Sequence, residues 1–474
     1  MKNLQDLGNK YYLNNSIIFF KNNFEKRSKF LKNKKFLFLE ISDFINNCIN
    51  ESKKILLFCA GNSLISRNLK SNEIYIKEIS DEYKINHKEN IKYYDNFSSN
   101  LISECDNIIV ADIEHQLNPA KNLLDLSNNI NDDARIIILS KNIIWMILIK
   151  ILKLLLGFSP KENNFLPSSY LYNLYSSCNL EIVRTERIIA FPVNIPILTN
   201  FINKLFRLPI LNLLCVSSIT ILKKIQKNKE YKNQEIFSFI IPCKNEEKNI
   251  PLFNEKLPKN NKNYEFLFGD DNSSDNTKNE IIKLSKHQTD LNILRYDGPG
   301  ICKSENVYKG IDMANGDVII IYDADLTVDF KDIEFALNIL KNTNTDFINC
   351  TRMIYPQKNK AMKTLNFFGN GFFGFLFSVL FKKKVTDTLC GTKIFYKKHW
   401  DKIKKGNGKW GAKDLWGDFD LLIGAYKNNL KITEVPVVYY ERIEGETKMT
   451  SLFSNTVRMI WIVVSAYYKL RLKI

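Results

Sequence analysis

The sequence predicts an α/β protein built from two doubly wound domains, and three observations lead to that prediction. Short runs of isoleucine, valine and leucine without polar alternation recur in both halves of the 474-residue chain, as in parallel strands that are buried on both faces. Stretches with helical spacing separate these runs, which gives the alternation of a doubly wound sheet. A polar, charged segment over residues 223–236 has the composition of a linker, so we expect domains over residues 1–222 and 237–474.

The apolar runs place the expected strands. Before the linker we expect strands at Lys54–Cys59, Ile74–Ile76, Asn107–Ala111 and Arg135–Leu139. After the linker we expect strands at Ser238–Ile241, Glu265–Phe268, Asn292–Arg295, Asp317–Tyr322 and Asp346–Cys350. Ligands bind beyond the carboxyl ends of the strands in such sheets, and the acidic clusters of the second half follow strands at those ends.

The composition of the chain limits the classes of protein to consider. With 45% hydrophobic and 25% charged residues, it is typical of a folded protein. The formal charge of +17 favours anionic partners, but an AT-rich genome also enriches lysine, and no nucleic acid partner is expected from charge alone. Nine scattered cysteines without a Cys-x-x-Cys pair argue against a zinc site and a disulfide framework. A cytoplasmic protein without a signal peptide is expected.

Three apolar stretches raise the question of a membrane contact: Ile143–Gly157, Phe367–Phe381 and Met459–Tyr468. Each is shorter than the roughly 20 apolar residues of a spanning helix, so we expect either buried helices or helices that lie in the membrane interface. Three lysines follow directly on Phe381, and for that stretch the two interpretations are equally well supported. We expect a peripheral protein at the inner face of an anionic membrane.

Asp323 and Asp325 follow a buried apolar strand and lie two residues apart. Two carboxylates this close raise each other's pKa unless a cation neutralises them. Mg²⁺ and Mn²⁺ take oxygen ligands and bridge phosphate oxygens, and such an ion stabilises the charge on a nucleoside diphosphate as that group leaves. The pair is a candidate site for a metal and a diphosphate; the alternative is an ordinary acidic loop.

Neighbouring motifs favour the first interpretation. In order along the chain they are Pro242–Glu247, Asp270–Thr277 and Asp323–Asp325. With these motifs the segment from Phe237 to about Ser451 resembles the family 2 glycosyltransferases, whose fold is called GT-A. Three further segments resemble the branch of dolichyl- and undecaprenyl-phosphate sugar transferases: Asp387–Lys393, Glu434–Val437 and Arg442–Lys448.

The resemblance implies a role for each site residue. Asp271 would face the base or ribose, and Arg442 and Lys448 would be loop cations over the diphosphate, where charge-assisted hydrogen bonds are strong. Arg352 would meet an anionic acceptor. The residues implied to bind the nucleotide sugar are Pro242, Asn245, Glu246, Asp271, Asp323, Ala324, Arg442 and Lys448. Lys303 could touch a phosphate, but a solvated lysine is the favoured interpretation.

Two departures from the family pattern affect the site. Lys244 stands where the family often has a tyrosine that stacks on the base, and Thr327 stands where the lipid-phosphate branch often has a glutamine that binds the metal. The expected metal ligands are thus Asp323, Asp325 and Thr327, the last directly or through water.

The acceptor decides whether a base is needed, because a phosphate is already a nucleophile and a sugar hydroxyl must lose a proton. The expected catalytic residues are Asp325 and Asp418, the second of which lies where many family members place a base; a helix N-cap is an equally supported role for Asp418. No Arg-Trp pair occurs in the chain, which argues against a processive polysaccharide synthase.

The first domain resembles a class I methyltransferase that uses S-adenosylmethionine, over roughly Phe36 to Leu222. The resemblance lies in Leu57–Ser63, in Glu78 and in Ala111–His115. It implies that Gly61, Glu78 and Asp112 bind the cofactor. Only one glycine of the usual glycine-rich turn is present, so a decayed domain that only binds a partner is the alternative.

The sequence therefore predicts an inverting, metal-dependent transfer of a sugar from a nucleotide sugar. The expected acceptor belongs to cell-surface glycan or polyprenyl-phosphate-sugar synthesis, and the expected cofactors are Mg²⁺ or Mn²⁺ with, for the first domain, S-adenosylmethionine and methylation. Two alternatives stay open: a glycosyltransferase that acts on a sugar hydroxyl, and a binding or scaffold protein with a decayed methyltransferase domain.

Overall fold

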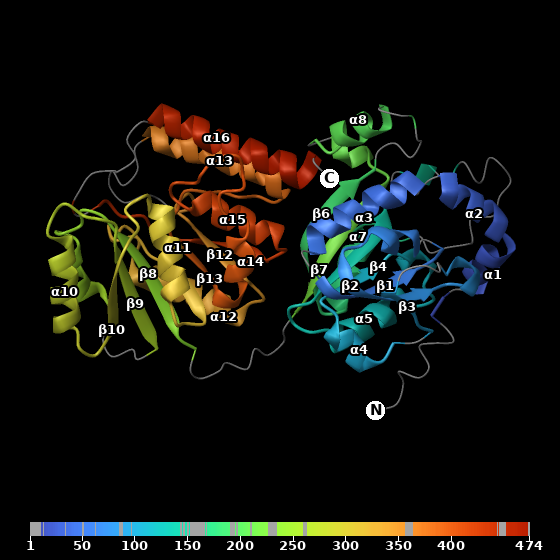
Figure 1. The fold of residues 1–474 in the computed structure, drawn as a ribbon, viewed down its shortest axis with the longest axis horizontal. Coiled ribbons are helices and arrows are strands. Elements are labelled where there is room, and N and C mark those ends of the chain that lie inside the picture. The colour runs from blue at the N-terminus through green and yellow to red at the C-terminus, as the bar shows by residue number, and fades with distance from the viewer. Residues whose placement is uncertain are drawn as a thin grey trace. The chain divides into compact units, whose positions relative to one another are not determined.

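The computed structural model describes residues 11–472 apart from some short segments. Those outside the description are residues 13, 34, 50–51, 62, 85–88, 96, 143–144, 146, 149–150, 152–165, 167, 190–194, 196–197, 209–210, 226–234, 259–262, 356–363, 443 and 445–451. Lys448, most of the stretch Ile143–Gly157 and most of the expected linker lie outside the described residues. The chain divides into two compact units, Met1–Gln226 with Leu470–Ile474, and Lys227–Lys469 (Figure 1).

The described residues of the first unit form a seven-stranded sheet in the order β3-β2-β1-β4-β5-β7-β6. Strands β1 to β5 are parallel, whereas β7 runs antiparallel to both β5 and β6. The strands are β1 (Ser52–Cys59), β2 (Ser71–Glu78), β3 (Ile91–Tyr93), β4 (Asn107–Val110), β5 (Arg135–Lys141), β6 (Leu180–Ile188) and β7 (Ser217–Lys224). The order reverses between β1 and β4, which makes their carboxyl ends the expected ligand-binding crevice.

Helices cover both faces of this sheet. Alternate residues of β1 enter different cores: Ile55 and Leu57 pack with α3, while Leu56 and Phe58 pack with α4, α5 and α7. The helices are α1 (Asn14–Asn22), α2 (Phe24–Asn33), α3 (Lys35–Ile49), α4 (Ser99–Glu104), α5 (Pro119–Asn129), α7 (Ser168–Ser177) and α8 (Leu198–Leu205). This two-sided burial explains why the strands are continuous apolar runs.

The second unit also has a seven-stranded sheet in its described part, in the order β10-β9-β8-β11-β13-β12-β14. All neighbouring pairs are parallel except those that β13 makes with β11 and β12. The strands are β8 (Phe237–Cys243), β9 (Tyr264–Asp270), β10 (Asn292–Asp297), β11 (Val318–Ile321), β12 (Phe347–Thr351), β13 (Lys393–Tyr396) and β14 (Ile432–Pro436). Here the order reverses between β8 and β11.

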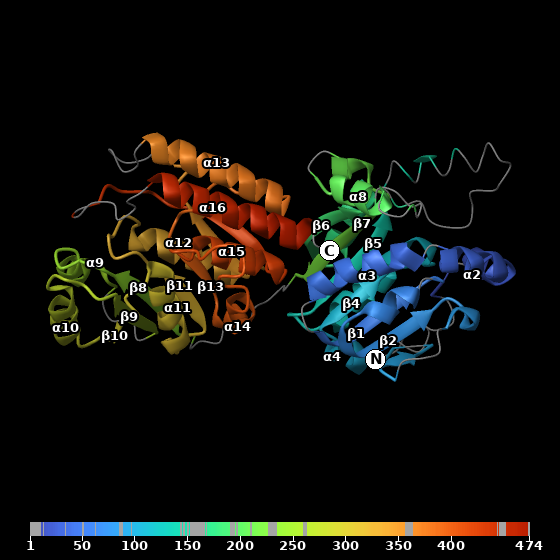
Figure 2. The ribbon, with the colours of Figure 1, turned by 45° about the horizontal axis from the view of Figure 1, so that its top comes forward.

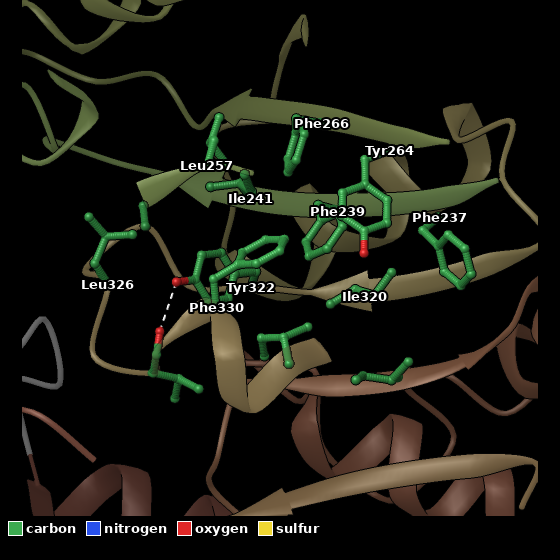
Figure 3. Packing of buried hydrophobic residues seen from close by; sticks show 14 of the residues in the cluster. Phe237, Phe239, Ile241, Leu257, Tyr264, Phe266, Ile320, Tyr322, Leu326 and Phe330 are labelled. Atoms are coloured by element: carbon green, nitrogen blue, oxygen red, sulfur yellow. Dashed lines mark hydrogen bonds between the residues drawn. The ribbon is translucent and has the colours of Figure 1, made fainter. Parts of the chain in front are cut away.

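The core of the second unit is rich in aromatic side chains. Phe239 stacks on Phe266 and Phe330, and Tyr322 lies edge-on to Phe330 (Figure 3). The helices are α9 (Phe253–Lys256), α10 (Thr277–His287), α11 (Lys303–Met313), α12 (Phe330–Asn342), α13 (Thr364–Phe381), α14 (Trp400–Lys404), α15 (Asp418–Lys427) and α16 (Leu452–Tyr467). Of the helices described, none combines the length and the hydrophobicity needed to span a bilayer.

The structure corrects three sequence expectations about the fold. Both sheets are mixed, because β7 and β13 are antiparallel strands that the apolar-run pattern did not detect. Strand β7 extends to Lys224, two residues into the segment expected to be a linker. The last residues of the chain lie in the first unit, because Arg471 forms an ion pair with Glu186 and its carbonyl accepts a hydrogen bond from Arg207.

Candidate active site

Three loops at the carboxyl ends of β8, β9 and β11 form the candidate site, on both sides of the point where the strand order reverses. Each loop contains a non-glycine residue in the left-handed region: Asn245 with φ of 53°, Asn272 with 59° and Leu326 with 53°. Asparagine adopts this conformation with some ease, but leucine rarely does. Backbone strain of this kind concentrates at functional sites, so the Leu326 turn favours a role for the acidic pair beside it.

The loop after β11 is held in place from both ends. The Tyr322 hydroxyl donates to the Val328 carbonyl over 2.8 Å and closes the loop (Figure 3). The Thr327 hydroxyl donates to Asp325 Oδ1 over 2.9 Å. Thr327 was expected to be a metal ligand, and this hydrogen bond gives its hydroxyl a position that orients the Asp325 carboxylate. Ala324, expected in the nucleotide site, has a buried side chain.

Asp323 has a glycine directly beside it. A Cβ atom at Gly391 would lie 2.2 Å from Asp323 Oδ2, which is far inside van der Waals contact. Only glycine therefore leaves room for the observed position of this carboxylate. Gly391 belongs to the segment Asp387–Lys393, which resembles the lipid-phosphate branch. The position of Asp323 explains why this segment has a glycine there.

Two cations neutralise the acidic pair. Lys303 Nζ lies 2.5 Å from Asp323 Oδ1, and Arg442 Nε lies 2.9 Å from Asp325 Oδ2. Burial acts to raise the pKa of Asp323, but the ion pair with Lys303 outweighs it and lowers the pKa. Burial and the charge of Asp323 raise the pKa of Asp325 despite Arg442. Lys303 is thus no solvated lysine, which corrects the favoured sequence interpretation.

The loops after β8 and β9 are hydrogen-bonded to each other. The Asn245 amide donates to Ser273 Oγ over 2.9 Å, and Asn245 Oδ1 accepts from the Ser274 amide over 2.8 Å. The Glu246 amide donates to Thr277 Oγ1 over 2.7 Å. Pro242, the last residue but one of β8, pairs with Gly269 of β9. The motifs Pro242–Glu247 and Asp270–Thr277 therefore form one hydrogen-bonded surface, which we call the ledge.

Asp271 lies at the centre of this ledge. Its Oδ1 accepts from the Gly300 amide over 2.7 Å, and Lys244 Nζ is 3.9 Å from its Oδ2. Lys244 stands where the family often has a stacking tyrosine, and in this chain it faces a carboxylate instead. The segment around Gly300 closes the ledge on the β10 side.

Arg352 forms a bidentate ion pair with Asp387. Its Nε and Nη2 atoms lie 2.8 and 3.0 Å from the two carboxylate oxygens, and its guanidinium lies over the Tyr439 ring at 4.9 Å. Burial acts to raise the pKa of Asp387, but Arg352 outweighs it and holds the pKa at about 2. Arg352 was expected to bind the acceptor, and in the structure two of its three guanidinium nitrogens already donate to Asp387.

Asp418 lies at the start of α15, yet it does not cap that helix. Asp414 accepts from the amides of Phe419 and Asp420 over 2.8 and 3.0 Å, so the N-cap role suggested for Asp418 is wrong. The Asp418 carboxylate instead accepts from the buried Lys393 Nζ over 2.9 Å. Its charge also reaches Lys303, because Asp323 and Asp418 together raise the pKa of that lysine against the effect of its burial.

The candidate residues of the first unit also meet at strand ends. Gly61, with φ of 67°, donates its amide to Glu78 Oε1 over 2.6 Å. Asp112 Oδ1 accepts from Gln116 Nε2 over 2.8 Å. Burial raises the pKa of Glu78 to about 7 and that of Asp112 to about 6.

Sequence reasoning missed several residues that hold the site together. Asp387, Gly391 and Lys393 were expected only as members of the motif Asp387–Lys393, and no role was expected for Asp414. Their signal was present, because three of the four lie in one seven-residue segment. In the part of the chain that the structure describes, no three His, Cys, Asp or Glu side chains form a group that could hold a metal.

Comparison with known proteins agrees with this geometry. The model of the family described as "Glycosyl transferase family 2" matches residues 238–403. The second unit contains a family 2 glycosyltransferase domain. The matched segment includes all three site loops, Lys303 and Gly391.

Two relatives are both named dolichyl-phosphate beta-glucosyltransferases and come from Trichomonas vaginalis. ALG5D is 23% identical over 256 residues, which are 51% of this chain and 76% of the relative. ALG5C is 24% identical over 244 residues, which are 48% of this chain and 70% of the relative.

Similar solved structures include two transferases crystallised with Mn²⁺. Glucosyl-3-phosphoglycerate synthase from Mycobacterium tuberculosis, in complex with Mn²⁺, UDP and its product, has a TM-score of 0.37 at 15% identity and covers 50% of this chain and 81% of that one. The mannosyltransferase PcManGT from Pyrobaculum calidifontis, with GDP-Man and Mn²⁺, has a TM-score of 0.36 at 14% identity and covers 50% and 70%.

Proposed function

We propose that the family 2 glycosyltransferase domain, with the GT-A arrangement, transfers a hexose from a nucleotide sugar to a polyprenyl phosphate. The observation that supports it most is the meeting of Asp323, Asp325, Lys303 and Arg442 at the switch point of the sheet. Both dolichyl-phosphate relatives in the comparison point to the same class of acceptor. The enzyme would act at the inner face of a membrane, where such a lipid presents its phosphate.

The reaction is a single displacement with inversion. An oxygen of the acceptor phosphate attacks the anomeric carbon and forms the new bond. The bond from that carbon to the diphosphate oxygen breaks, and its electron pair leaves with the nucleoside diphosphate. A phosphate acceptor has no proton to lose at this step, so the transfer needs charge stabilisation and positioning more than a base.

The donor set fits a hard divalent cation. Asp323 and Asp325 supply carboxylate oxygens from one loop, and each raises the cost of ionising the other. Mg²⁺ or Mn²⁺ held there would neutralise charge on the leaving diphosphate. Since two protein carboxylates leave most ligand positions open, the remaining ligands would come from the diphosphate and water.

Other residues of the chain would bind the nucleoside and the diphosphate. Asp271, Pro242, Asn245 and Glu246 form the ledge for the nucleoside. Lys303 and Arg442 would turn from the carboxylates to the diphosphate oxygens, where charge-assisted bonds are about twice as strong as neutral ones. Lys448, which lies outside the described residues, is the further cation that the resemblance implies at the diphosphate.

A sugar hydroxyl is the second candidate acceptor, and one observation favours it. Asp418 is a buried carboxylate whose charge reaches Lys303 beside the diphosphate site, so a base is available near the reacting centre. Its hydrogen bond with Lys393 would hold it in place.

The test is a transfer assay with the full chain. A panel of radiolabelled nucleotide sugars is incubated with Mn²⁺ and polyprenyl phosphate, and the label in the lipid fraction is counted. The Asp325→Asn variant should lose activity by a factor of about 10² to 10³, the usual size of a lost electrostatic contribution. Asp290→Asn, a charge change at an exposed residue near the opposite end of β10, should keep it.

Full activity of Asp325→Asn would disprove the role of the acidic pair. Label that reaches a water-soluble sugar but never the lipid phosphate would favour the hydroxyl acceptor. Methylation by the first unit is assayed in parallel with labelled S-adenosylmethionine, since the resemblance of that unit implies it.

A further inference from the structure

Helices α13 and α16 of the second unit form one exposed apolar surface. The two helices contact each other and lie side by side in both views (Figure 1, Figure 2). Each has an inner face that packs on the unit and an outer face of large apolar side chains. We call the two outer faces together the aromatic surface.

On α13 the two faces alternate with helical spacing. Phe373 and Phe377 point inward and pack on Phe419 of α15 at 5.6 and 4.7 Å between ring centroids. Phe368 and Phe375 point outward and are 68% and 64% exposed. An exposed apolar helix face with side chains of this size is typical of a surface that binds another molecule or a membrane.

On α16 the same division holds. Met459, Ile462 and Val463 are buried. Phe453, Val457 and Trp461, which are spaced four residues apart, face outward and are 84%, 51% and 57% exposed. The aromatic surface thus extends over both helices.

We propose that the aromatic surface docks on an anionic lipid bilayer. Neither helix contains an acidic residue, so the two helices carry no negative side chain that would repel anionic headgroups. Lys382 and Lys384 follow α13 directly and are exposed, and basic residues beside an apolar helix face are attracted to an anionic leaflet. The charge distribution selects a bilayer over a second copy of this chain, because a basic surface repels its own copy.

The docking helix is connected to the candidate site. Asn370 of α13 donates its Nδ2 to Asp387 Oδ1 over 2.7 Å, and Asp387 holds Arg352. A bilayer that seats α13 therefore fixes the carboxylate behind the guanidinium expected to meet the acceptor phosphate. This inference rests on the proposed function only in the identity of the acceptor; the docking itself can be tested alone.

The test is flotation of the full chain with phosphatidylcholine vesicles with or without about 30% anionic lipid. The wild type should float with the anionic vesicles. The double variant Phe368→Ser/Phe375→Ser and the single variant Trp461→Ser should bind at least about tenfold less. Phe335→Ser is the matched control, because Phe335 is 53% exposed on α12, away from the aromatic surface.

Hydrolysis of the nucleotide sugar without lipid separates the two proposals. The surface variants should hydrolyse it at the wild-type rate, which also shows that they fold. Equal flotation of the wild type and the variants would overturn the docking proposal, as would a wild-type dimer that the variants dissociate. Flotation without any sugar-transfer activity would overturn the proposed function and leave the docking surface intact.

In the first unit, the expected ligand crevice at the carboxyl ends of β1 and β4 is filled by the chain's own side chains. Tyr11, Tyr12 and Phe20 belong to the core beneath the strand ends and are 5%, 6% and 1% exposed. The Tyr12 hydroxyl donates to the carbonyl of Cys59, the last residue of β1, over 2.6 Å. A Cβ atom at Gly61 would lie 2.7 Å from Phe20 Cε1, so the glycine turn is already in contact with a ring.

The remaining candidate ligands of the crevice are also engaged. The Tyr11 ring stacks on Phe58 of β1 at 5.3 Å. Gln116 Nε2 donates to the Tyr11 hydroxyl over 2.6 Å and to Asp112 over 2.8 Å. The Tyr11 carbonyl accepts from the amide of Leu117 over 2.8 Å. Tyr11, Tyr12 and Phe20 therefore fill the crevice. Tyr12 is hydrogen-bonded to the end of β1, and Tyr11 to residues that follow β4.

We infer that Tyr11, Tyr12 and Phe20 are a built-in occupant of this crevice and that the first unit binds no nucleoside cofactor while they are in place. The probes are S-adenosylmethionine and S-adenosylhomocysteine at about 1 mM, which detects any dissociation constant in the micromolar range. Equilibrium dialysis of the full chain should show no uptake, and hydrogen exchange should show the amides around Tyr11–Phe20 as protected as the core. Saturable uptake by the wild type, or free exchange of that segment, would overturn the inference.

Discussion

Lys303 Nζ lies 2.5 Å from Asp323 Oδ1, so a lysine at the start of α11 neutralises the first carboxylate of the candidate metal pair. The ion pair keeps Asp323 ionised although the site is partly buried. A lysine in this position would move to phosphate when a metal and a diphosphate arrive. The same side chain would then stabilise both the empty and the loaded site.

Lys303→Met should therefore slow the transfer of the sugar without weakening the binding of Mn²⁺. Without the lysine, Mn²⁺ has no competitor for Asp323, so the Mn²⁺ concentration for half-maximal activity should stay equal or fall. The turnover rate should drop about 100-fold, because the positive charge that would stabilise the leaving diphosphate is lost. The measurement is kcat against Mn²⁺ and nucleotide-sugar concentration.

Lys309→Met is the matched control for that variant. Lys309 lies on the same helix and is exposed, with its Nζ on the Asp297 carbonyl. Its kcat should equal the wild-type value. An unchanged kcat in Lys303→Met would rule out the proposed contact with phosphate.

Gly391→Ala should inactivate the enzyme without unfolding it. The added Cβ would lie 2.2 Å from Asp323 Oδ2, so the carboxylate must rotate away from Lys303 and from the metal position. We expect at least about a tenfold loss of nucleotide-sugar hydrolysis, of the order seen when one electrostatic group is displaced. Gly371→Ala is the control, because a Cβ there meets nothing within 4 Å. Wild-type hydrolysis by Gly391→Ala would contradict the steric argument.

The pair Arg352–Asp387 should matter for stability as well as for the acceptor. Asp387 is fully buried and bonded to Arg352 through both oxygens. Breaking such a pair leaves an uncompensated buried charge and costs about 3–5 kcal/mol. Arg352→Met should therefore lower the free energy of unfolding by that amount at pH 7.

The pH dependence of that loss has a definite sign. The pKa of Asp387 is about 2 in the folded chain and about 4 in an unfolded one, so its stabilising effect is present above pH 4 and is lost between pH 4 and 2. The difference between wild type and Arg352→Met should shrink in that window. A difference that stays constant down to pH 2 would show that the ion pair is not its cause.

The sequence predicted most of the parallel strands because they are buried on both faces, and such burial leaves a continuous apolar run. It did not predict β3, β6, β7 or β13. Strand β6 is half-buried along most of its length and reads as a mixed polar run, Leu180–Ile188, while β13 is four residues long and contains the buried Lys393. Strand β14 overlaps the motif Glu434–Val437, which the sequence did not predict to be a strand. Edge position and short length remove the pattern on which such a prediction depends.

In the candidate site, too, the sequence predicted some features and not others. Asp271, Asp323 and Asp325 could be predicted, because an acidic residue that follows an apolar strand is visible in the sequence. The contacts that orient them could not, because Lys303, Gly391 and Lys393 come from distant parts of the chain. The role of Asp418 needed the structure too, since only the hydrogen bonds of Asp414 show which carboxylate caps α15.

Glu78 should make the stability of the first unit depend on pH. Burial raises its pKa from 4.5 to about 7, and its Oε1 accepts from the amides of Gly61 and Ile79. Below pH 4.5 the carboxyl is protonated in both the folded and the unfolded chain. As the pH rises from 4.5 to 7 the unfolded chain loses the proton first, so the stability of the unit falls.

Glu78→Gln should remove this penalty and keep the acceptor for both amides. We expect the variant to be more stable than the wild type by about 1–3 kcal/mol at pH 8, and no more stable than it at pH 4.5, because one pKa unit corresponds to about 1.4 kcal/mol. The measurement is the urea midpoint of the full chain at the two pH values. Glu82→Gln, an exposed neighbour, should show no such change with pH, and a gain for Glu78→Gln that is equal at both pH values would show that a buried charge is not its origin.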